Sequence, residues 1–436
     1  MVEVLQDFGG STSAFPCRYL GLPLSFRKPR RLEILPIIEK MAGRLKGWKG
    51  RLLSRSGRLA LINSVLTSLT TYYLTIFAAN PWAIKKMDKL RRNFLWKGDE
   101  EASGSSCLVS WKKVCAPKSM GGLGIKELAA YSRALRLRWI WFDWGEEDRP
   151  WKGTDLPVSE VDRQLFSACT QIKLGAGDKA RFWSDNWLQG LEPRMVAPSL
   201  FKLATRKKIS VKEGVENGNW MRGLWSMSDA EQVSQFCMLW GLIREVQLSA
   251  EVDRVTWRLT ANKEYSATSA YHFQFEARLP RPMLESVWKV KAEPKVKFYI
   301  WCLLQNRNWT ADRLQTRGWP HDDHCSFCDQ ILETAAHLTL TCPFAKEVWC
   351  QFLGSHPKVV NAAAGETSIQ GWWGKLQGAM NQKDFKKQAC TAMYIAWHLW
   401  RERNQRVFQN KRASAAAVAA LVREELKRLK EALALE

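Results

Sequence analysis

Apolar residues recur at intervals of three and four along most of the chain, which predicts a predominantly helical protein. One apolar stripe comprises Ile34, Ile37, Ile38, Met41 and Leu45, and a second comprises Ile84, Met87, Leu90 and Phe94. Asn80-Pro81 separates two helices and Lys97-Gly98-Asp99 ends the second, because proline and glycine interrupt helical backbone. The sequence therefore predicts a helical region from Arg31 to about Lys97.

The C-terminal half follows the same helical spacing. A helix is expected over Lys295–Leu304, and an apolar stripe of core type runs through Cys390, Met393, Trp397 and Trp400. Ser414 is placed to cap a last helix. One side of that helix carries Val418, Val422, Leu426, Leu429 and Leu433. It could pack on the body of the protein or pair with another helix.

Short strands are predicted only in the middle of the chain. Alternation through Val255–Leu259 indicates a strand, Asn262-Lys263 a turn, and Tyr265-Ser266-Ala267 a partner strand, after which Ser269 could cap a helix. Two glycine-rich runs, at 121–124 and 175–178, indicate turns and not phosphate loops, because neither is followed by the Lys-Ser/Thr pair of a phosphate loop. The second run predicts a hairpin turn that leads into Arg181. The fold class is therefore α+β, predominantly α-helical.

One uncharged stretch, between Arg58 and Lys85, is long enough to span a bilayer. It contains several hydroxyl and amide side chains and is broken at Asn80-Pro81, while apolar residues recur at helical spacing on one face. We therefore predict a core helix and no membrane partner.

Composition adds a strong positive charge to this picture. The net charge of +23 and the 66 lysines and arginines favour a polyanionic partner, which could be RNA, DNA or an anionic membrane face. A basic protein without a nucleic-acid role is the alternative. The cations concentrate early in the chain, where helical side chains could contact successive phosphates, although a solvated helix face would look the same. The residues predicted to bind nucleic acid are Arg27, Lys28, Arg30, Arg31, Arg44, Lys46, Lys49, Arg51, Arg55, Arg58, Lys85, Lys86, Lys89 and Arg92.

The sharpest chemistry lies in four residues with the spacing C-x2-C-x8-H-x4-C, namely Cys325, Cys328, His337 and Cys342. Thiolate and imidazole ligands in tetrahedral number select zinc, and four protein ligands leave no open position for water. The sequence thus predicts a structural Zn²⁺ site. The alternative is a set of buried free cysteines with a satisfied core histidine. His321 and His324 could substitute for one ligand, but we expect them on the surface or behind the ligands.

The N-terminus lacks the basic and apolar regions of a signal peptide, which predicts a reducing, intracellular setting, nuclear or cytoplasmic and not secreted. In such a setting grouped cysteines more often hold metal than form disulfides.

The zinc spacing and the segment after it, Phe344–Trp349, resemble the zinc-binding domain of plant LINE-type (non-LTR) retrotransposon reverse transcriptases. Further segments resemble that family in the expected order. The segment that leaves the polymerase palm is similar to Tyr19–Leu24, and the helical thumb is similar to Leu59–Leu66 and Arg92–Gly98. The stretch between thumb and zinc domain is similar to Ser110-Trp111, Gly121–Ile125 and Arg181–Asp185. The segment before the zinc site is similar to Trp288-Lys289, Pro294–Phe298 and Trp301, and the segment after it to Trp400–Asn404.

This resemblance implies a domain order. Residues 1–25 would be the end of a truncated polymerase palm, 26–145 a thumb-like helical region, 146–268 a connecting region with hairpins, 269–355 the zinc-binding domain, and 356–436 a helical C-terminal tail. The family's aromatic-x-Asp-Asp signature lies before the segment matched at Tyr19, and the only adjacent aspartates, Asp322-Asp323, are expected in an exposed loop. Polymerase chemistry needs paired carboxylates for two metal ions.

We therefore expect no catalytic residues and no enzymatic activity in this chain alone. The leading hypothesis is a retroelement-derived nucleic-acid-binding protein with a structural zinc site. Its alternatives are a structural or protein-interaction module, and a part that completes a polymerase whose palm is supplied by a separate protein.

Overall fold

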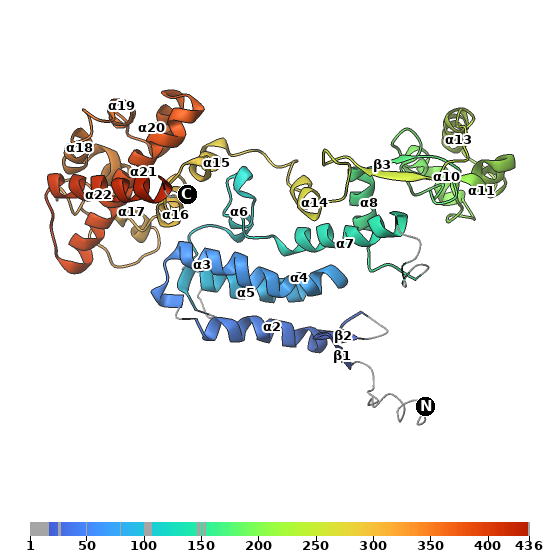
Figure 1. The fold of residues 1–436 in the computed structure, drawn as a ribbon, viewed down its shortest axis with the longest axis horizontal. Helices are drawn as coiled ribbons and strands as arrows, with labels where there is room; N and C mark the ends of the chain where they lie inside the picture. Colours follow the sequence, from blue (N-terminus) through green and yellow to red (C-terminus); the bar gives the residue numbers. More distant parts are fainter. Residues whose placement is uncertain are drawn as a thin grey trace. The chain divides into compact units, whose positions relative to one another are not determined.

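The computed structural model describes residues 17–24, 28–48, 50–78, 80–99, 107–145, 149, 151 and 154–434. Its contacts divide the chain into two compact units, each built from separate stretches of sequence. Unit 1 comprises Met1–Pro29, Thr70–Pro81 and Leu128–Glu276, and unit 2 comprises Arg30–Leu69, Trp82–Glu127 and Ala277–Glu436. Helices dominate both units and the strands are few and short, which confirms the predominantly helical α+β class (Figure 1).

The early helices of unit 2 follow the predicted apolar stripes. They are α2 (Arg31–Lys46), α3 (Arg55–Leu61), the π-helical turn η2 (Ile62–Leu66) and α5 (Pro81–Lys97). Ile34, Met41, Met87 and Phe94 are at most 1% exposed, so these stripes form the core as predicted. Helix α4 (Thr67–Ile76) ends before Asn80-Pro81, and Gly98 takes a φ of +77° immediately after α5, which confirms both predicted helix boundaries.

The helical segment Arg55–Ile76 is long and apolar enough to cross a membrane by length and composition. Leu59, Ile62 and Leu66 bury one of its faces, as predicted. Ser64 and Ser68 lie on the exposed side, and their hydroxyls donate to backbone carbonyls one turn earlier. Because the uncovered side carries polar groups, the core-helix interpretation accounts for the pattern, and the absence of a membrane partner stays a prediction.

The first glycine-rich run forms a tight turn. It follows α6 (Trp111–Val114) and the 3-10 turn η4 (Lys118–Met120). Gly121 and Gly124 have φ of +75° and +74°. A Cβ on Gly122 would lie 2.0 Å from the carbonyl oxygen of Ala116, so only glycine fits there. Trp301 Nε1 donates to the Gly121 carbonyl at 2.8 Å. The prediction of a turn is therefore confirmed.

The rest of unit 2 is a helical assembly around the long helix α21 (Gln382–Gln409). Its other elements are α15 (Pro282–Lys289), α16 (Pro294–Leu303), α17 (Ala311–Gln315), η6 (His337–Thr341), α18 (Pro343–Cys350), α19 (Pro357–Ala363), α20 (Ile369–Gly378) and α22 (Ala415–Ala434). Ser414 caps α22 as predicted, accepting from the Ala417 amide at 3.2 Å. Helix α22 packs on α21 and α18, so the body of the protein covers its apolar side.

Unit 1 contains both strand pairs. A two-residue turn at Leu20-Gly21, with φ of +50° and +81°, joins β1 (Cys17–Tyr19) to the antiparallel β2 (Leu22–Leu24). Strand β4 (Arg254–Trp257) forms where the alternation predicted it, but its partner is β3 (Thr170–Lys173). The predicted local hairpin with Tyr265–Ala267 is wrong, because Ser266 instead caps α14 (Ala267–Phe273), accepting from the Ser269 amide.

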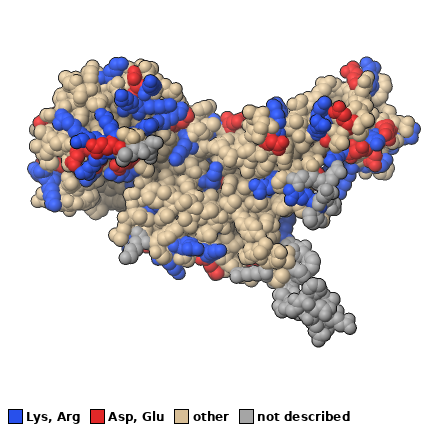
Figure 2. Space-filling model, in the orientation of Figure 1, with Lys and Arg blue, Asp and Glu red and all other residues tan. Residues whose placement is uncertain are grey.

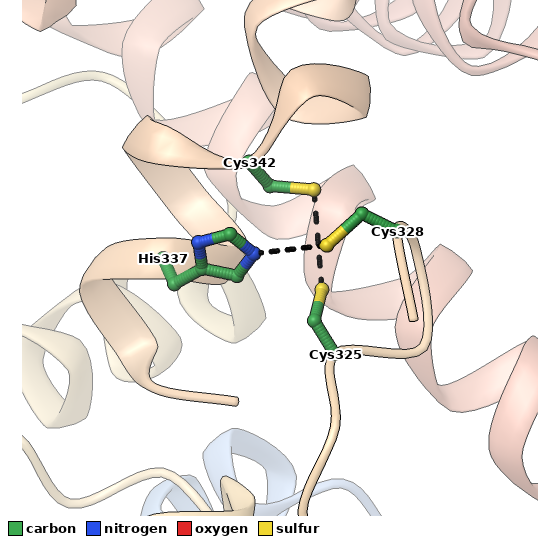
Figure 3. A group of neighbouring side chains, drawn as sticks. All are labelled: Cys325, Cys328, His337 and Cys342. Atoms are coloured by element: carbon green, nitrogen blue, oxygen red, sulfur yellow. Dashed lines mark hydrogen bonds between the residues drawn. The ribbon is translucent and has the colours of Figure 1, made fainter. Parts of the chain in front are cut away.

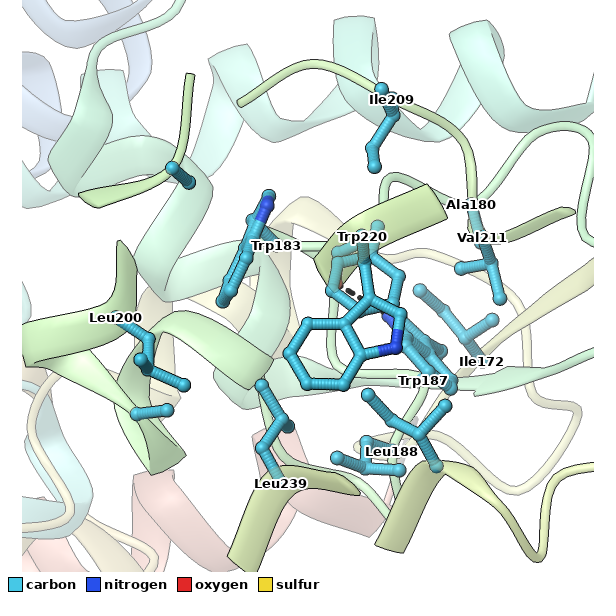
Figure 4. Close-up of a cluster of buried hydrophobic side chains, with 14 residues drawn as sticks. Ile172, Ala180, Trp183, Trp187, Leu188, Leu200, Ile209, Val211, Trp220 and Leu239 are labelled. Atoms are coloured by element: carbon cyan, nitrogen blue, oxygen red, sulfur yellow. Dashed lines mark hydrogen bonds between the residues drawn. The ribbon is translucent and has the colours of Figure 1, made fainter. Parts of the chain in front are cut away.

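Tryptophans fill the core of unit 1 (Figure 4). Trp183, Trp187 and Trp220 are at most 5% exposed, and the Phe182 ring stacks on Trp220 with centroids 5.8 Å apart. The surrounding helices are α7 (Leu128–Gly145), α8 (Glu160–Cys169), α9 (Pro193–Val196), α10 (Pro198–Leu203), α11 (Val211–Val215), α12 (Asn219–Arg222) and α13 (Ala230–Ile243), with the 3-10 turn η5 (Glu216–Gly218). These aromatic residues serve packing, as the sequence favoured for most of the tryptophans.

The second glycine-rich run closes around a carboxylate of the protein itself. The Asp253 side chain accepts hydrogen bonds from the amides of Gly175, Gly177, Lys179 and Ala180 at 2.7 to 3.1 Å. Burial opposes ionisation of this carboxyl, but the four amides outweigh that effect and lower its pKa. Since Asp253 occupies these amides, the loop does not offer them to a phosphate.

Candidate metal centre

Two of the four predicted zinc ligands lie on one tight turn. The Cys325 amide donates to the Ile331 carbonyl at 2.8 Å, and the Asp329 amide donates back to the Cys325 carbonyl at 2.8 Å. Asp329 takes a φ of +57°, which lets the chain reverse directly after Cys328. The turn thereby places both thiols on the same side.

The other two ligands come from consecutive helical turns. His337 begins the π-helical turn η6, and Cys342 is the residue that precedes Pro343 at the start of α18. Proline suits the first helical position because its missing N–H has no intrahelical acceptor there. Thr341 lies 3.1 Å from His337 Nδ1, so its hydroxyl can accept from that nitrogen and leave Nε2 as the ligand atom.

The four ligand atoms converge on one point (Figure 3) and lie within 4.8 Å of one another. Cys325 Sγ and Cys342 Sγ are 3.9 Å apart, and Cys328 Sγ is 3.4 Å from His337 Nε2. Zinc–sulfur bonds of about 2.3 Å at the tetrahedral angle place two sulfurs about 3.8 Å apart. The donors therefore fit a tetrahedral zinc ion, as the spacing predicted.

The surroundings of the site favour the ligand forms of two residues. The pKa of Cys342 is lowered by its hydrogen bond with Cys325 and by the backbone amides of Phe344 and Ala345 in the first turn of α18. Burial lowers the pKa of His337, so its imidazole is neutral at neutral pH. A thiolate and a neutral imidazole are the forms that bind zinc.

His321 and His324 lie outside the ligand cluster, as expected. His321 Nδ1 is 2.6 Å from the Trp319 carbonyl, and His324 is exposed at a bridge to Leu332. Asp322 and Asp323 are exposed loop residues, as predicted.

Helix α21 holds the zinc turn through residues that the sequence analysis did not assign a role. The Phe327 and Phe344 rings lie against each other, and the Arg406 guanidinium lies over both, 4.9 and 4.4 Å from their centroids. Arg406 also donates to the Ser326 carbonyl at 3.2 Å. One turn earlier, Arg403 forms a buried ion pair with Glu333 at 2.7 Å. The resemblance at Trp400–Asn404 was the only sequence signal at this position.

The predicted nucleic-acid-binding cations have different surroundings. Arg27 and Lys49 lie outside the described residues, and Lys28 is exposed in unit 1. Arg58 is 8% exposed, and its guanidinium donates to the carbonyls of Gly50 and Leu95, so these donors are used within the fold. Arg55 and Arg92 are half-buried, while the remaining ones, Arg30, Arg31, Arg44, Lys46, Arg51, Lys85, Lys86 and Lys89, are exposed.

Two comparisons with known proteins bear on this site. Residues 265–349, which contain all four ligands, match a family described as zinc-binding in reverse transcriptase. The chain is also 25% identical to a protein of Arabidopsis thaliana named "Putative ribonuclease H protein", over 72% of this chain and 54% of that protein. The chain thus spans about half the length of that relative. The match and the ligand geometry together support zinc as the bound metal.

Proposed function

We propose that this chain is a nucleic-acid-binding protein derived from a LINE-type retroelement, with a structural zinc ion and no polymerase activity of its own. The observation that carries the proposal is a set of cations on α2 and α5 without anionic partners. None of them has an ion pair with another described residue. This set, called the α2/α5 cations below, comprises Lys40, Arg44, Lys46, Lys85, Lys86, Lys89 and Arg92.

Unpaired cations on helices are suited to a phosphate backbone. Lys85, Lys89 and Arg92 stand at i, i+4 and i+7 on α5, which places them along one side of the helix. Each contact with a phosphate releases condensed counterions, so the affinity should depend on salt and little on sequence. Lys and Arg side chains also prevail in Figure 2 over the part of unit 2 that contains α20 to α22.

The proposed role of zinc is to hold one part of unit 2 in shape. Four protein ligands leave no open coordination position for a reacting water, which supports a structural ion. The family matched at residues 265–349 supports a retroelement origin. Asp322 and Asp323, the adjacent aspartates of the printed sequence, are exposed loop residues, which supports a chain without polymerase chemistry of its own.

The test is binding of a labelled RNA and a matched duplex DNA across a salt series. We expect affinity to fall steeply with salt, and the triple variant Lys85→Gln, Lys89→Gln, Arg92→Gln to bind on the order of tenfold more weakly with a shallower salt slope. The control removes three exposed cations from unit 1, Lys202, Arg206 and Lys208, each replaced by Gln. Absence of binding at low salt would refute the proposal and favour a zinc-stabilised interaction module.

A further inference from the structure

A cavity of about 310 Å³ lies within unit 2, close to the start of α3. Helix α16 contributes Phe298 and Tyr299, helix α21 contributes Trp397 and Trp400, and the loop after α16 contributes Trp309. This volume falls in the range of small-molecule sites, which are typically apolar clefts with a few polar groups that fix orientation.

Three cations line this cavity, Arg55, Arg58 and Lys295, and Arg55 has no anionic partner among the described residues. Among the described residues, its guanidinium has neither a carboxylate nor a hydrogen-bond acceptor, and it lies over the Trp96 ring, 5.9 Å from the centroid. Arg58, one turn further along α3, contrasts with it, because two backbone carbonyls accept from its guanidinium. Partial burial of a guanidinium without a hydrogen-bond acceptor costs desolvation free energy. An anion bound in the cavity would accept hydrogen bonds from Arg55 and offset this cost.

Lys295, the third cation of the cavity, is already neutralised. Lys295 Nζ lies 2.6 Å from a carboxylate oxygen of Glu293. Burial lowers the pKa of Arg55, which reflects the same lack of compensation, yet the group stays charged at neutral pH. Arg55 is therefore the point at which the cavity would hold an anion.

The walls of the cavity are aromatic. Tyr299 stacks on Trp400 with centroids 5.9 Å apart and meets Trp397 edge-on at 5.4 Å. Trp309, Trp397 and Trp400 are only half-buried. Arg317 lies over the Trp309 ring and Arg403 over the Trp400 ring, at 4.9 and 5.4 Å from the centroids, so these two rings are partly covered. Aromatic rings of this kind stack on nucleobases without regard to their identity.

Two buried donors at the cavity also lack acceptors. Asn308 is 6% exposed, and neither its Nδ2 nor Nε1 of Trp397 has a hydrogen-bond partner. Nucleobases offer carbonyl and ring-nitrogen acceptors around their edges. The cavity thus combines an unpaired cation, aromatic walls and unused donors.

We propose that this cavity binds one unpaired nucleotide of a single-stranded nucleic acid, with its phosphate on Arg55 and its base against Trp309, Trp397 and Trp400. The inference rests on the proposed nucleic-acid-binding function and adds to it a site that distinguishes single strands from duplexes. A paired base is covered by its neighbours in the stack and cannot enter the cavity.

The experiment compares binding of a short labelled oligouridine strand with binding of a matched RNA duplex, using zinc-loaded protein. Arg55→Gln should weaken single-strand binding on the order of tenfold and change duplex binding by less than about twofold. Arg244→Gln is the matched control, since Arg244 is an exposed residue of unit 1 that also lies over a tryptophan ring, 5.6 Å from the Trp240 centroid. Zinc content and melting temperature confirm that each variant is folded.

Competition on the wild-type protein tests the same site without a substitution. Uridine monophosphate should displace the strand at least about tenfold better than uridine or inorganic phosphate, because only the nucleotide carries both base and phosphate. Equal loss of single-strand and duplex binding in Arg55→Gln, or no loss in either, would overturn the inference. So would loss of uridine monophosphate binding with strand binding intact, which would indicate a site for free nucleotides.

The two proposals fail differently. If the wild-type protein binds neither strand nor duplex at low salt, the proposed function itself is wrong. If it binds both and Arg55→Gln makes no difference, only the cavity assignment is wrong.

Discussion

The buried ion pair between Arg403 and Glu333 gives the sharpest test of how unit 2 is held together. Arg403 Nη2 lies 2.7 Å from Glu333 Oε1, and Nε lies 3.1 Å from both carboxylate oxygens. The side chains are 7% and 2% exposed. Glu333 also accepts from the Ala311 amide at 3.1 Å. The pair thereby joins α21, the start of α17 and the segment that connects the zinc turn to His337.

Arg403→Met keeps most of the side-chain volume and removes the charge. It leaves the Glu333 carboxylate buried with a single backbone donor, which should lower the free energy of unfolding by about 3 to 5 kcal/mol. A unit of this size loses about 2 to 4 °C of melting temperature per kcal/mol, so the expected drop is about 6 to 20 °C. The double variant Glu333→Leu, Arg403→Met leaves no unpaired charge and should recover most of that loss.

The assay is thermal and urea unfolding of zinc-saturated protein, with the double-mutant cycle giving the coupling energy. Arg401→Met is the control, because Arg401 lies on the same helix, is 43% exposed and pairs with Glu425 at 3.2 Å. Arg401 is exposed and Glu425 keeps His398 and Lys295 as neighbours, so we expect the loss of this pair to cost less than about 1 kcal/mol. If Arg403→Met costs no more than Arg401→Met, or if the double variant costs the sum of its single changes, the ion pair does not hold these segments together.

Two further predictions concern the metal and the half-buried acid Asp185. The wild-type protein should bind one zinc ion, and Cys342→Ser should lose the ion together with a marked loss of melting temperature. The control Cys350→Ser, at an exposed cysteine of α18, should keep the zinc ion and the wild-type melting temperature. Metal analysis after dialysis and thermal unfolding measure the two outcomes. Burial raises the pKa of Asp185 to about 6, so this carboxyl stabilises unit 1 below pH about 4 and the contribution is lost as pH rises through about 6. Asp185→Asn should therefore raise the free energy of unfolding by about 1 to 3 kcal/mol at pH 7.5 and change it little at pH 4, and equal effects at both pH values would contradict the assignment.

The zinc ligands could be predicted from the sequence because all four lie within one short segment. Two cysteines three residues apart fit one tight turn whatever surrounds them, and the histidine and last cysteine follow on adjacent helical turns. The helices of unit 2 were predictable for a similar reason. Apolar spacing over a few turns determines which face of a helix is buried, as Ile34, Met41 and Phe94 show.

Strand pairing could not be predicted in the same way. Strand β4 was expected from its alternation. Its partner is β3, where Val255 pairs with Ile172, 83 residues earlier, and no local pattern specifies such a pairing. The nearest extended segment was the natural candidate. It was wrong because the Ser266 side chain satisfies a helix N-terminus instead.

The same distinction separates the charged residues. By itself the sequence determined that the chain carries many cations and a zinc site, since net charge and ligand spacing are properties of the sequence. Only the tertiary structure decided which cations are available: it turned Arg58 towards two carbonyls, buried Arg403 against Glu333, and left Arg55 facing an aromatic cavity without an anion. The physical reason is that the partners of a side chain come from segments far away in sequence. Those segments determine whether a cation is desolvated, and whether it is paired within the fold or remains able to bind a ligand.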